Sequence, residues 1–153
     1  MTDRNKNMTL YAIAIASILM QFAPVMPLQI FSMLLLLGLF ATLPFYRRSV
    51  DPASGHYSHV TWVNRSLWIW SFILILGMIA AAVLIATTFQ HSDFLNVMND
   101  LASMNTNTPM VRKFIWISSS AVAPSFFYLG WRLFKGLRTA LRGLPVDNPK
   151  SLL

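Results

Sequence analysis

The chain contains no cysteine and no glutamate, and it has little charge of either sign. The absence of cysteine excludes disulfide bonds, thiolate chemistry and cysteine-based metal sites. Only 11% of the 153 residues are charged, whereas soluble domains carry about 25%. A chain with so few charges is expected to have lipid, and not water, over most of its outer surface.

Hydrophobic side chains are abundant and make up 56% of the residues. The net charge is +7, from twelve basic and five acidic residues. A basic balance can indicate nucleic-acid binding, but here the basic residues flank apolar runs, where they set membrane topology and attract anionic headgroups. We therefore expect anionic lipid of the inner leaflet as a partner, and no nucleic acid.

Four apolar runs predict four transmembrane helices, over 8–23, 28–46, 67–89 and 114–131. At a rise of about 1.5 Å per residue, the shorter runs just span a hydrocarbon core about 30 Å thick. Pro24 and Pro27 separate the first two runs and predict a tight helical hairpin, because proline ends a helix. The whole chain, 1–153, is expected to be one integral membrane domain of the all-α class.

The first run follows a basic start, as it would in a secretory signal peptide. Its end does not suit cleavage, because Gln21-Phe22-Ala23 lacks a small residue two positions before Ala23 and Pro24 would follow the cut. We therefore expect an uncleaved first span.

The distribution of basic residues predicts the orientation of these spans. With four spans and the N-terminus inside, ten of the twelve basic residues lie on the cytoplasmic side, as the positive-inside rule requires. These ten are Arg4, Lys6, Arg47, Arg48, Arg65, Arg132, Lys135, Arg138, Arg142 and Lys150. The sequence thus predicts a multi-pass protein of the bacterial inner membrane with both termini in the cytoplasm (N-in/C-in).

The stretch 131–144 predicts a basic amphipathic helix that continues from the last apolar run and lies on the membrane surface. On a helix, its four basic residues fall within an arc of about 120° opposite the apolar side chains. These residues, which we expect to bind anionic lipid, are Arg132, Lys135, Arg138 and Arg142. The alternative is that they only determine topology.

Small residues recur at a spacing of four in two of the runs. Gly77 and Ala81, and likewise Ala12 and Ala16, match the small-xxx-small spacing that lets helix backbones approach closely. We expect these faces to pack helices together, either within the bundle or against another membrane protein.

The centre of the last apolar run is polar and suggests a different function. Pro124 lacks a backbone N–H, so a kink is expected, with Ser119 and Ser120 nearby to satisfy the freed groups. A kinked, hydroxyl-lined centre can form a transport site. Transport sites usually contain an ionisable residue in the membrane, however, and none of the four runs has one.

His56 and His59 have the H-x-x-H spacing of some metal sites, with Asp51 upstream. A usable site normally needs three or four convergent ligands, so we interpret the pair as part of a solvated cytoplasmic loop. The sequence shows no nucleophile elbow, P-loop or dinucleotide fingerprint. We expect no metal, no cofactor and no enzymatic activity.

Two stretches carry a resemblance to a known family. They are His59-x-x-Trp62-x-x-Arg65-x-x-Trp68, and Trp131-Arg132-Leu133-x-Lys135-Gly136-Leu137 with Gly143-Leu144-Pro145-Val146-Asp147-Asn148-Pro149. Over 56–149 the chain resembles small bacterial inner-membrane proteins of uncharacterised function, distantly related to the chloroplast inner-envelope import (translocon) subunit. The resemblance implies a four-helix membrane fold and supplies no catalytic residues.

These observations lead to one functional hypothesis and one alternative. The leading hypothesis is a non-catalytic accessory or assembly subunit of a larger bacterial inner-membrane complex. The alternative is an oligomeric channel or transporter component, built around Ser119, Ser120 and Pro124.

Overall fold

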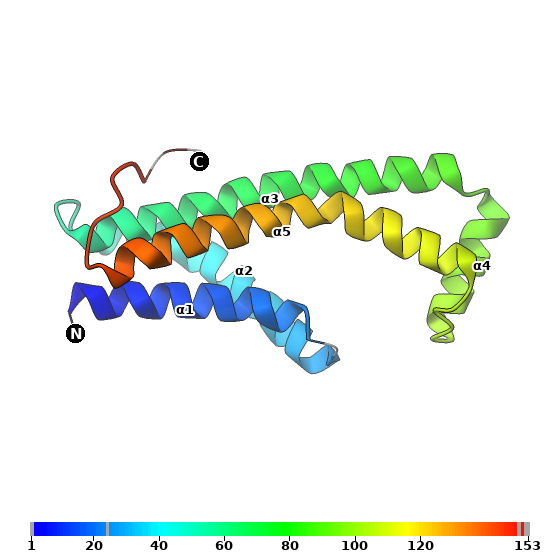
Figure 1. Cartoon of the computed structure of the whole chain (residues 1–153), viewed down its shortest axis with the longest axis horizontal. Helices are drawn as coiled ribbons and strands as arrows, with labels where there is room; N and C mark the ends of the chain where they lie inside the picture. Colours follow the sequence, from blue (N-terminus) through cyan, green and yellow to red (C-terminus); the bar gives the residue numbers. More distant parts are fainter. Residues whose placement is uncertain (1, 24, 150, 152–153) are drawn as a thin grey trace. The chain divides into compact units, whose positions relative to one another are not determined.

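The computed structural model describes residues 2–23, 25–149 and 151, and every regular element within them is an α-helix. The helices are α1 (Asp3–Gln21), α2 (Met26–Ser49), α3 (Gly55–Thr88), α4 (His91–Ala102) and α5 (Pro109–Leu141) (Figure 1). This architecture agrees with the predicted all-α class. Pro24 of the predicted hairpin turn and Lys150 of the predicted cytoplasmic set lie outside the described residues.

The prediction of four transmembrane helices is wrong. Among the described residues, two helices are long and apolar enough to cross a membrane, namely α2 and α3. Polar residues dilute the other two, because α1 begins in the polar segment 3–7 and α5 contains Arg112, Lys113 and the serines 118–120. Small and hydroxyl residues had been counted as apolar in the runs 8–23 and 114–131. The N-in/C-in orientation was derived from four spans and loses that basis.

The polar segment before the third run is mostly helix and not loop. Only residues 50–54 separate α2 from α3, which begins at Gly55, well before the apolar run starts at Leu67. The first turns of α3 bury polar side chains against α1, α2 and α5. Polarity along the chain suggested a loop here, but the folded protein supplies partners for these side chains.

The predicted amphipathic helix 131–144 is the end of α5 and not a separate surface helix. Leu133 and Ala140 are fully buried, so this stretch packs into the bundle. The helix ends in a Schellman motif, in which Gly143 adopts φ +70° and its N–H donates to the Ala140 carbonyl at 3.0 Å. The N–H of Leu144 donates to the Thr139 carbonyl at 3.2 Å.

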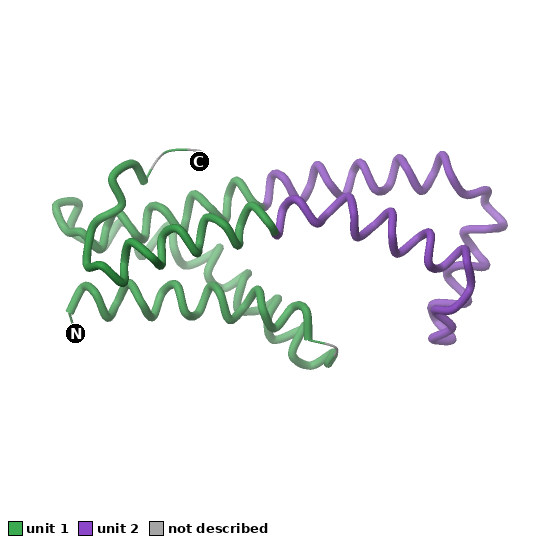
Figure 2. The backbone as a smooth tube through the Cα atoms, viewed as in Figure 1, with its two compact units in different colours: residues 1–70, 127–153 green, residues 71–126 purple. Residues whose placement is uncertain are grey.

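The chain divides into two compact units (Figure 2). Unit 1 comprises 1–70 and 127–153 and contains α1, α2, the start of α3 and the end of α5. Within unit 1, α1 packs on α2, and the Ser32 hydroxyl donates to the Ser17 carbonyl at 2.5 Å. Unit 2 comprises 71–126 and contains the rest of α3, α4 and the start of α5.

Two helices approach closely inside unit 2. Gly77 of α3 lies against the backbone of α5, so that a Cβ atom at this position would collide with the Ala121 carbonyl oxygen. Ala81, one turn further along α3, is only 8% exposed. The structure thus places Gly77 and Ala81 on a side of α3 that the protein itself covers.

The close approach at Gly77 predicts an asymmetry between two glycines. Gly77→Ala should cost about 1–3 kcal/mol, because backbone atoms of α5 cannot yield as a flexible side chain can. Gly38→Ala in α2 should be neutral or stabilising by up to about 1 kcal/mol, because no atom lies within 4 Å of the added methyl group. Thermal unfolding in detergent, followed by circular dichroism, measures both. Equal midpoints for the two variants would contradict the packing described here.

Candidate functional site

The first three turns of α3 carry four buried side chains on one face, and we call them the α3 polar face: His56, His59, Trp62 and Ser66. Their spacing of three or four residues brings them onto the same side of a helix. Each is at most 3% exposed. All four lie in unit 1, where each meets groups from other parts of the chain.

His56 joins α3 to α1 and α2. Its Nδ1 lies 2.5 Å from the side-chain oxygen of Asn7, and its Nε2 lies 2.9 Å from the Tyr46 hydroxyl. An amide oxygen only accepts hydrogen bonds, so Nδ1 of His56 carries the proton. The Nε2 atom of the neutral ring then accepts from Tyr46.

His59 has the opposite arrangement. Its Nε2 lies 2.9 Å from the Leu144 carbonyl oxygen, so Nε2 carries the proton and donates it. Its Nδ1 lies 3.1 Å from the Tyr11 hydroxyl, from which the neutral ring accepts. Burial raises the pKa of Tyr11, which keeps that hydroxyl protonated as a donor. His59 thereby joins α1 and the segment after α5 to α3.

Both histidines favour the neutral state. Burial lowers the pKa of His56 and of His59 from the ordinary value of 6.5. They precede Leu67, where the apolar run of α3 begins, and so lie outside the membrane-spanning segment. An added proton would turn the accepting nitrogen of each ring into a second donor and break its hydrogen bond from a tyrosine.

Arg132 of α5 is fully buried and contacts the indole of Trp62. Its guanidinium carbon lies 3.5 Å from the centre of the Trp62 ring, and the indole N–H donates to the Arg132 carbonyl at 2.9 Å. The guanidinium also donates from Nε to the Ser66 hydroxyl at 3.1 Å and from Nη1 to the Ser151 carbonyl at 2.8 Å. The contact with the face of the indole is therefore a desolvated cation–π pair.

No carboxylate compensates this buried charge within the described part of the chain, where the one ion pair is the exposed Lys6–Asp3. The Nη2 atom of Arg132 is also buried without a hydrogen-bond partner there. Burial lowers the pKa of Arg132, but a guanidinium starts so high that it remains charged at neutral pH. Arg132 therefore adds a positive charge to the interior of unit 1.

A glycine makes room for this arrangement. Gly136, one turn after Arg132, is buried against the ring and hydroxyl of Tyr11, and a Cβ atom on Gly136 would overlap them. Any side chain at this position would displace Tyr11 from His59. The spacing Arg132–Gly136 thus serves both the cation–π contact and the histidine contact.

The structure separates the four residues predicted to bind lipid. Arg132 lies on the buried side of α5, while Lys135, Arg138 and Arg142 are exposed. Arg132 sits at the edge of the basic arc, next to the buried positions Leu133 and Gly136, so packing draws it inward. Lipid binding by the other three stays a prediction.

The remaining predicted residues are also dispersed. In α1, Ala12 is exposed and Ala16 is half-buried, whereas Ala14 between them is fully buried. In α5, the residues of the predicted transport site, Ser119, Ser120 and Pro124, are exposed. The predicted solvated loop with His56 and His59 is instead buried helix, and the Asp51 carboxylate accepts the N–H of Ala53.

Asn7, Tyr11, Tyr46 and Arg132 were missed as members of the site. One signal in the sequence points to them, because the polar stretch 56–66 repeats every three or four residues, which is a helix period and not a loop pattern. The partners come from 10 to 85 residues away along the chain, so no local pattern identifies them.

Comparison with protein-family models, with curated proteins and with solved structures finds no match to this chain. The resemblance to small bacterial membrane proteins related to the chloroplast import subunit therefore stays an expectation from sequence. The case for a function depends on the geometry.

The histidines predict a pH-dependent stability. Because their pKa values are lower in the folded chain than in the unfolded one, the unfolded chain binds protons first as the pH falls. The free energy of unfolding should be constant above about pH 6.5 and then decrease, by at most about 1.4 kcal/mol per pH unit and histidine. Thermal unfolding in detergent between pH 7.5 and 5.5 measures this.

Gln at both His56 and His59 should flatten this pH dependence. His91→Gln, at an exposed position of α4, should retain it. A pH dependence that survives in the double variant would show that other groups cause it.

Proposed function

We propose that the chain is a non-catalytic accessory or assembly subunit, anchored in the bacterial inner membrane by α2 and α3 and packed against a larger complex. The observation that carries this proposal is the exposed apolar surface of these two helices. Exposed side chains of α3 in unit 2 include Phe72, Ile75, Leu76, Met78, Ile79, Val83 and Leu84. Such a surface requires lipid or another protein to cover it.

The α3 polar face supports the proposal in a different way. Both ring nitrogens of each histidine and the indole N–H of Trp62 are engaged by the chain's own groups. Side chains that are satisfied in this way fix helices relative to each other within unit 1. Their role in the proposal is to hold a rigid scaffold.

One end of unit 1 is basic and polar, and we propose that it faces the cytoplasm. The start of α1, the turn 50–54 and the end of α5 meet at this end (Figure 1). The basic residues of these segments are Arg4, Lys6, Arg47, Arg48, Lys135, Arg138 and Arg142. Positive charge next to apolar helices is retained on the cytoplasmic side.

A groove in unit 2 favours a helix of a partner protein over lipid alone. It has a volume of about 510 Å³ and lies between the end of α3, the start of α4 and Phe114 of α5. Ala82 and Ala86 of α3 line it and are exposed. Two small residues four positions apart let a second helix backbone approach closely. Unlike Gly77, they are not used by the chain's own helices.

The test is purification of the tagged protein from its native host in mild detergent, with mass spectrometry of the proteins that accompany it. We expect recovery in a fixed ratio with a larger membrane assembly. Recovery as a monomer or a symmetric oligomer would contradict the proposal.

The same purification locates the surface that contacts the partner. Leucine at both Ala82 and Ala86 should release the assembly while thermal stability stays within about 1 kcal/mol, because these residues are exposed. Ala80→Leu, on another side of the same helix, should leave the assembly intact. Equal release by both changes would exclude the groove as the contact.

A further inference from the structure

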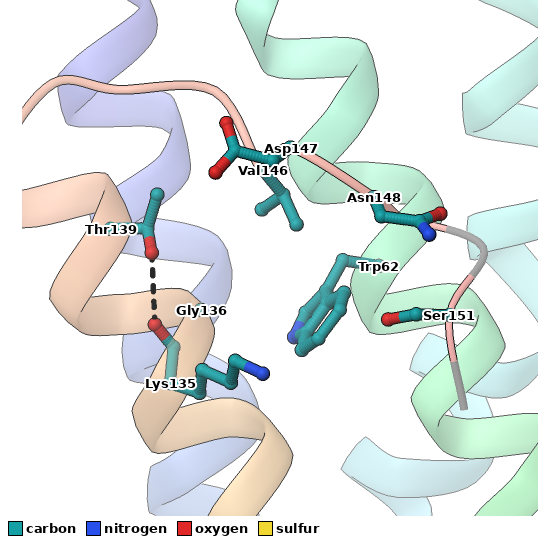
Figure 3. Close-up of a pocket in the computed structure, with 8 residues that line it drawn as sticks. All are labelled: Trp62, Lys135, Gly136, Thr139, Val146, Asp147, Asn148 and Ser151. Atoms are coloured by element: carbon teal, nitrogen blue, oxygen red, sulfur yellow. Dashed lines mark hydrogen bonds between the residues drawn. The ribbon is translucent and has the colours of Figure 1, made fainter. Parts of the chain in front are cut away.

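We propose that a pocket in unit 1, beside Trp62, binds the phosphate of a phospholipid headgroup. It has a volume of about 350 Å³ and lies between α3, the end of α5 and the segment that follows α5 (Figure 3). Its lining includes Trp62, Lys135, Thr139, Asp147, Asn148 and Ser151. The proposal concerns a ligand site and does not rest on membership of a larger complex.

A single cation projects into the pocket. Figure 3 shows Lys135 extending from α5 toward the indole of Trp62, and its ammonium nitrogen lies 5.7 Å from the ring centre. Within the described residues Lys135 forms no ion pair. Its charge is therefore available to an anion that enters the pocket.

The buried guanidinium of Arg132 adds to the positive potential of this pocket. Arg132 contacts two of the lining residues, because it stacks on Trp62 and donates to the carbonyl of Ser151. Two positive charges, Arg132 and Lys135, thus lie close to the same indole. In a partly desolvated site such charges attract an anion more strongly than exposed lysines do.

The other polar groups of the pocket suit a phosphodiester more than a simple anion. The Thr139 hydroxyl donates to the Lys135 carbonyl at 3.1 Å. The Asn148 amide can donate to a phosphate oxygen, whereas the Asp147 carboxylate repels it. A headgroup that continues into a hydroxyl or an ammonium can place that donor on Asp147, while its phosphate stays near Lys135.

The position of the pocket along α3 favours a lipid over free phosphate. Trp62 precedes the start of the apolar run at Leu67 by five residues, a rise of about 7.5 Å. The headgroup layer on each side of a bilayer is about 5–8 Å thick. With Leu67 at the edge of the hydrocarbon, the pocket lies at the depth of the lipid phosphates.

The test uses the full chain in detergent, titrated with dioleoyl phosphatidylglycerol and followed by native mass spectrometry. We expect one lipid to bind more tightly than the rest. Lys135→Gln should weaken this first binding step by about fivefold or more, the loss of one charge-assisted contact. The matched control is Arg138→Gln, which removes an equal charge one turn away from an exposed position outside the pocket lining, and should change it by less than about twofold.

Three results would overturn the proposal. Equal weakening by Lys135→Gln and Arg138→Gln would show diffuse attraction to a basic surface. Dioleoylglycerol binding as tightly as phosphatidylglycerol would show that the phosphate is not recognised. Displacement of the lipid by millimolar inorganic phosphate would show a site for free phosphate. Circular dichroism melting confirms that each variant is folded.

Discussion

Unit 1 depends on the partners that buried polar side chains of α3 find in the rest of the chain. An unpaired polar group inside a helical bundle costs about 1–3 kcal/mol, so each group must be matched by another segment. His56 is matched by Asn7 and Tyr46, and His59 by Tyr11 and the Leu144 carbonyl. These hydrogen bonds fix the start of α1, the end of α2 and the segment after α5 against one helix.

Trp62 and Arg132 extend the same logic from hydrogen bonds to charge. The indole accepts the cation on its face and donates its N–H to the backbone of the residue that carries that cation. A buried guanidinium without a carboxylate is costly, and the aromatic face and two oxygen acceptors offset part of that cost. A lysine at this position would lose the planar stacking and one of the two hydrogen bonds.

The sequence predicted helices well where one physical effect dominates. Apolar runs alone located α2 and the second half of α3, because side chains that face lipid need no partners. The same reasoning failed for α1 and α5, in which alanine, serine and glycine make a run look apolar without giving it enough hydrophobicity. It also failed for the first turns of α3, whose helical state depends on contacts that are distant along the chain.

The candidate site was only partly visible in the sequence. The H-x-x-H spacing of His56 and His59 is obvious, but the spacing does not reveal Asn7 or Tyr11, which come from α1. Arg132 looked like its basic neighbours Lys135 and Arg138, since all three lie within one arc of the helix. Only packing against Trp62 and Ser66 shows that Arg132 is turned inward.

The histidine tautomers provide the most direct test of this account. In a long-range nitrogen–proton correlation spectrum of labelled protein at pH 7.5, His56 should be protonated at Nδ1 and His59 at Nε2. The opposite tautomers are required because the acceptors differ, an amide oxygen at one ring and a backbone carbonyl at the other. The same tautomer for both rings, or averaging between the two as in water, would contradict the network on which unit 1 depends.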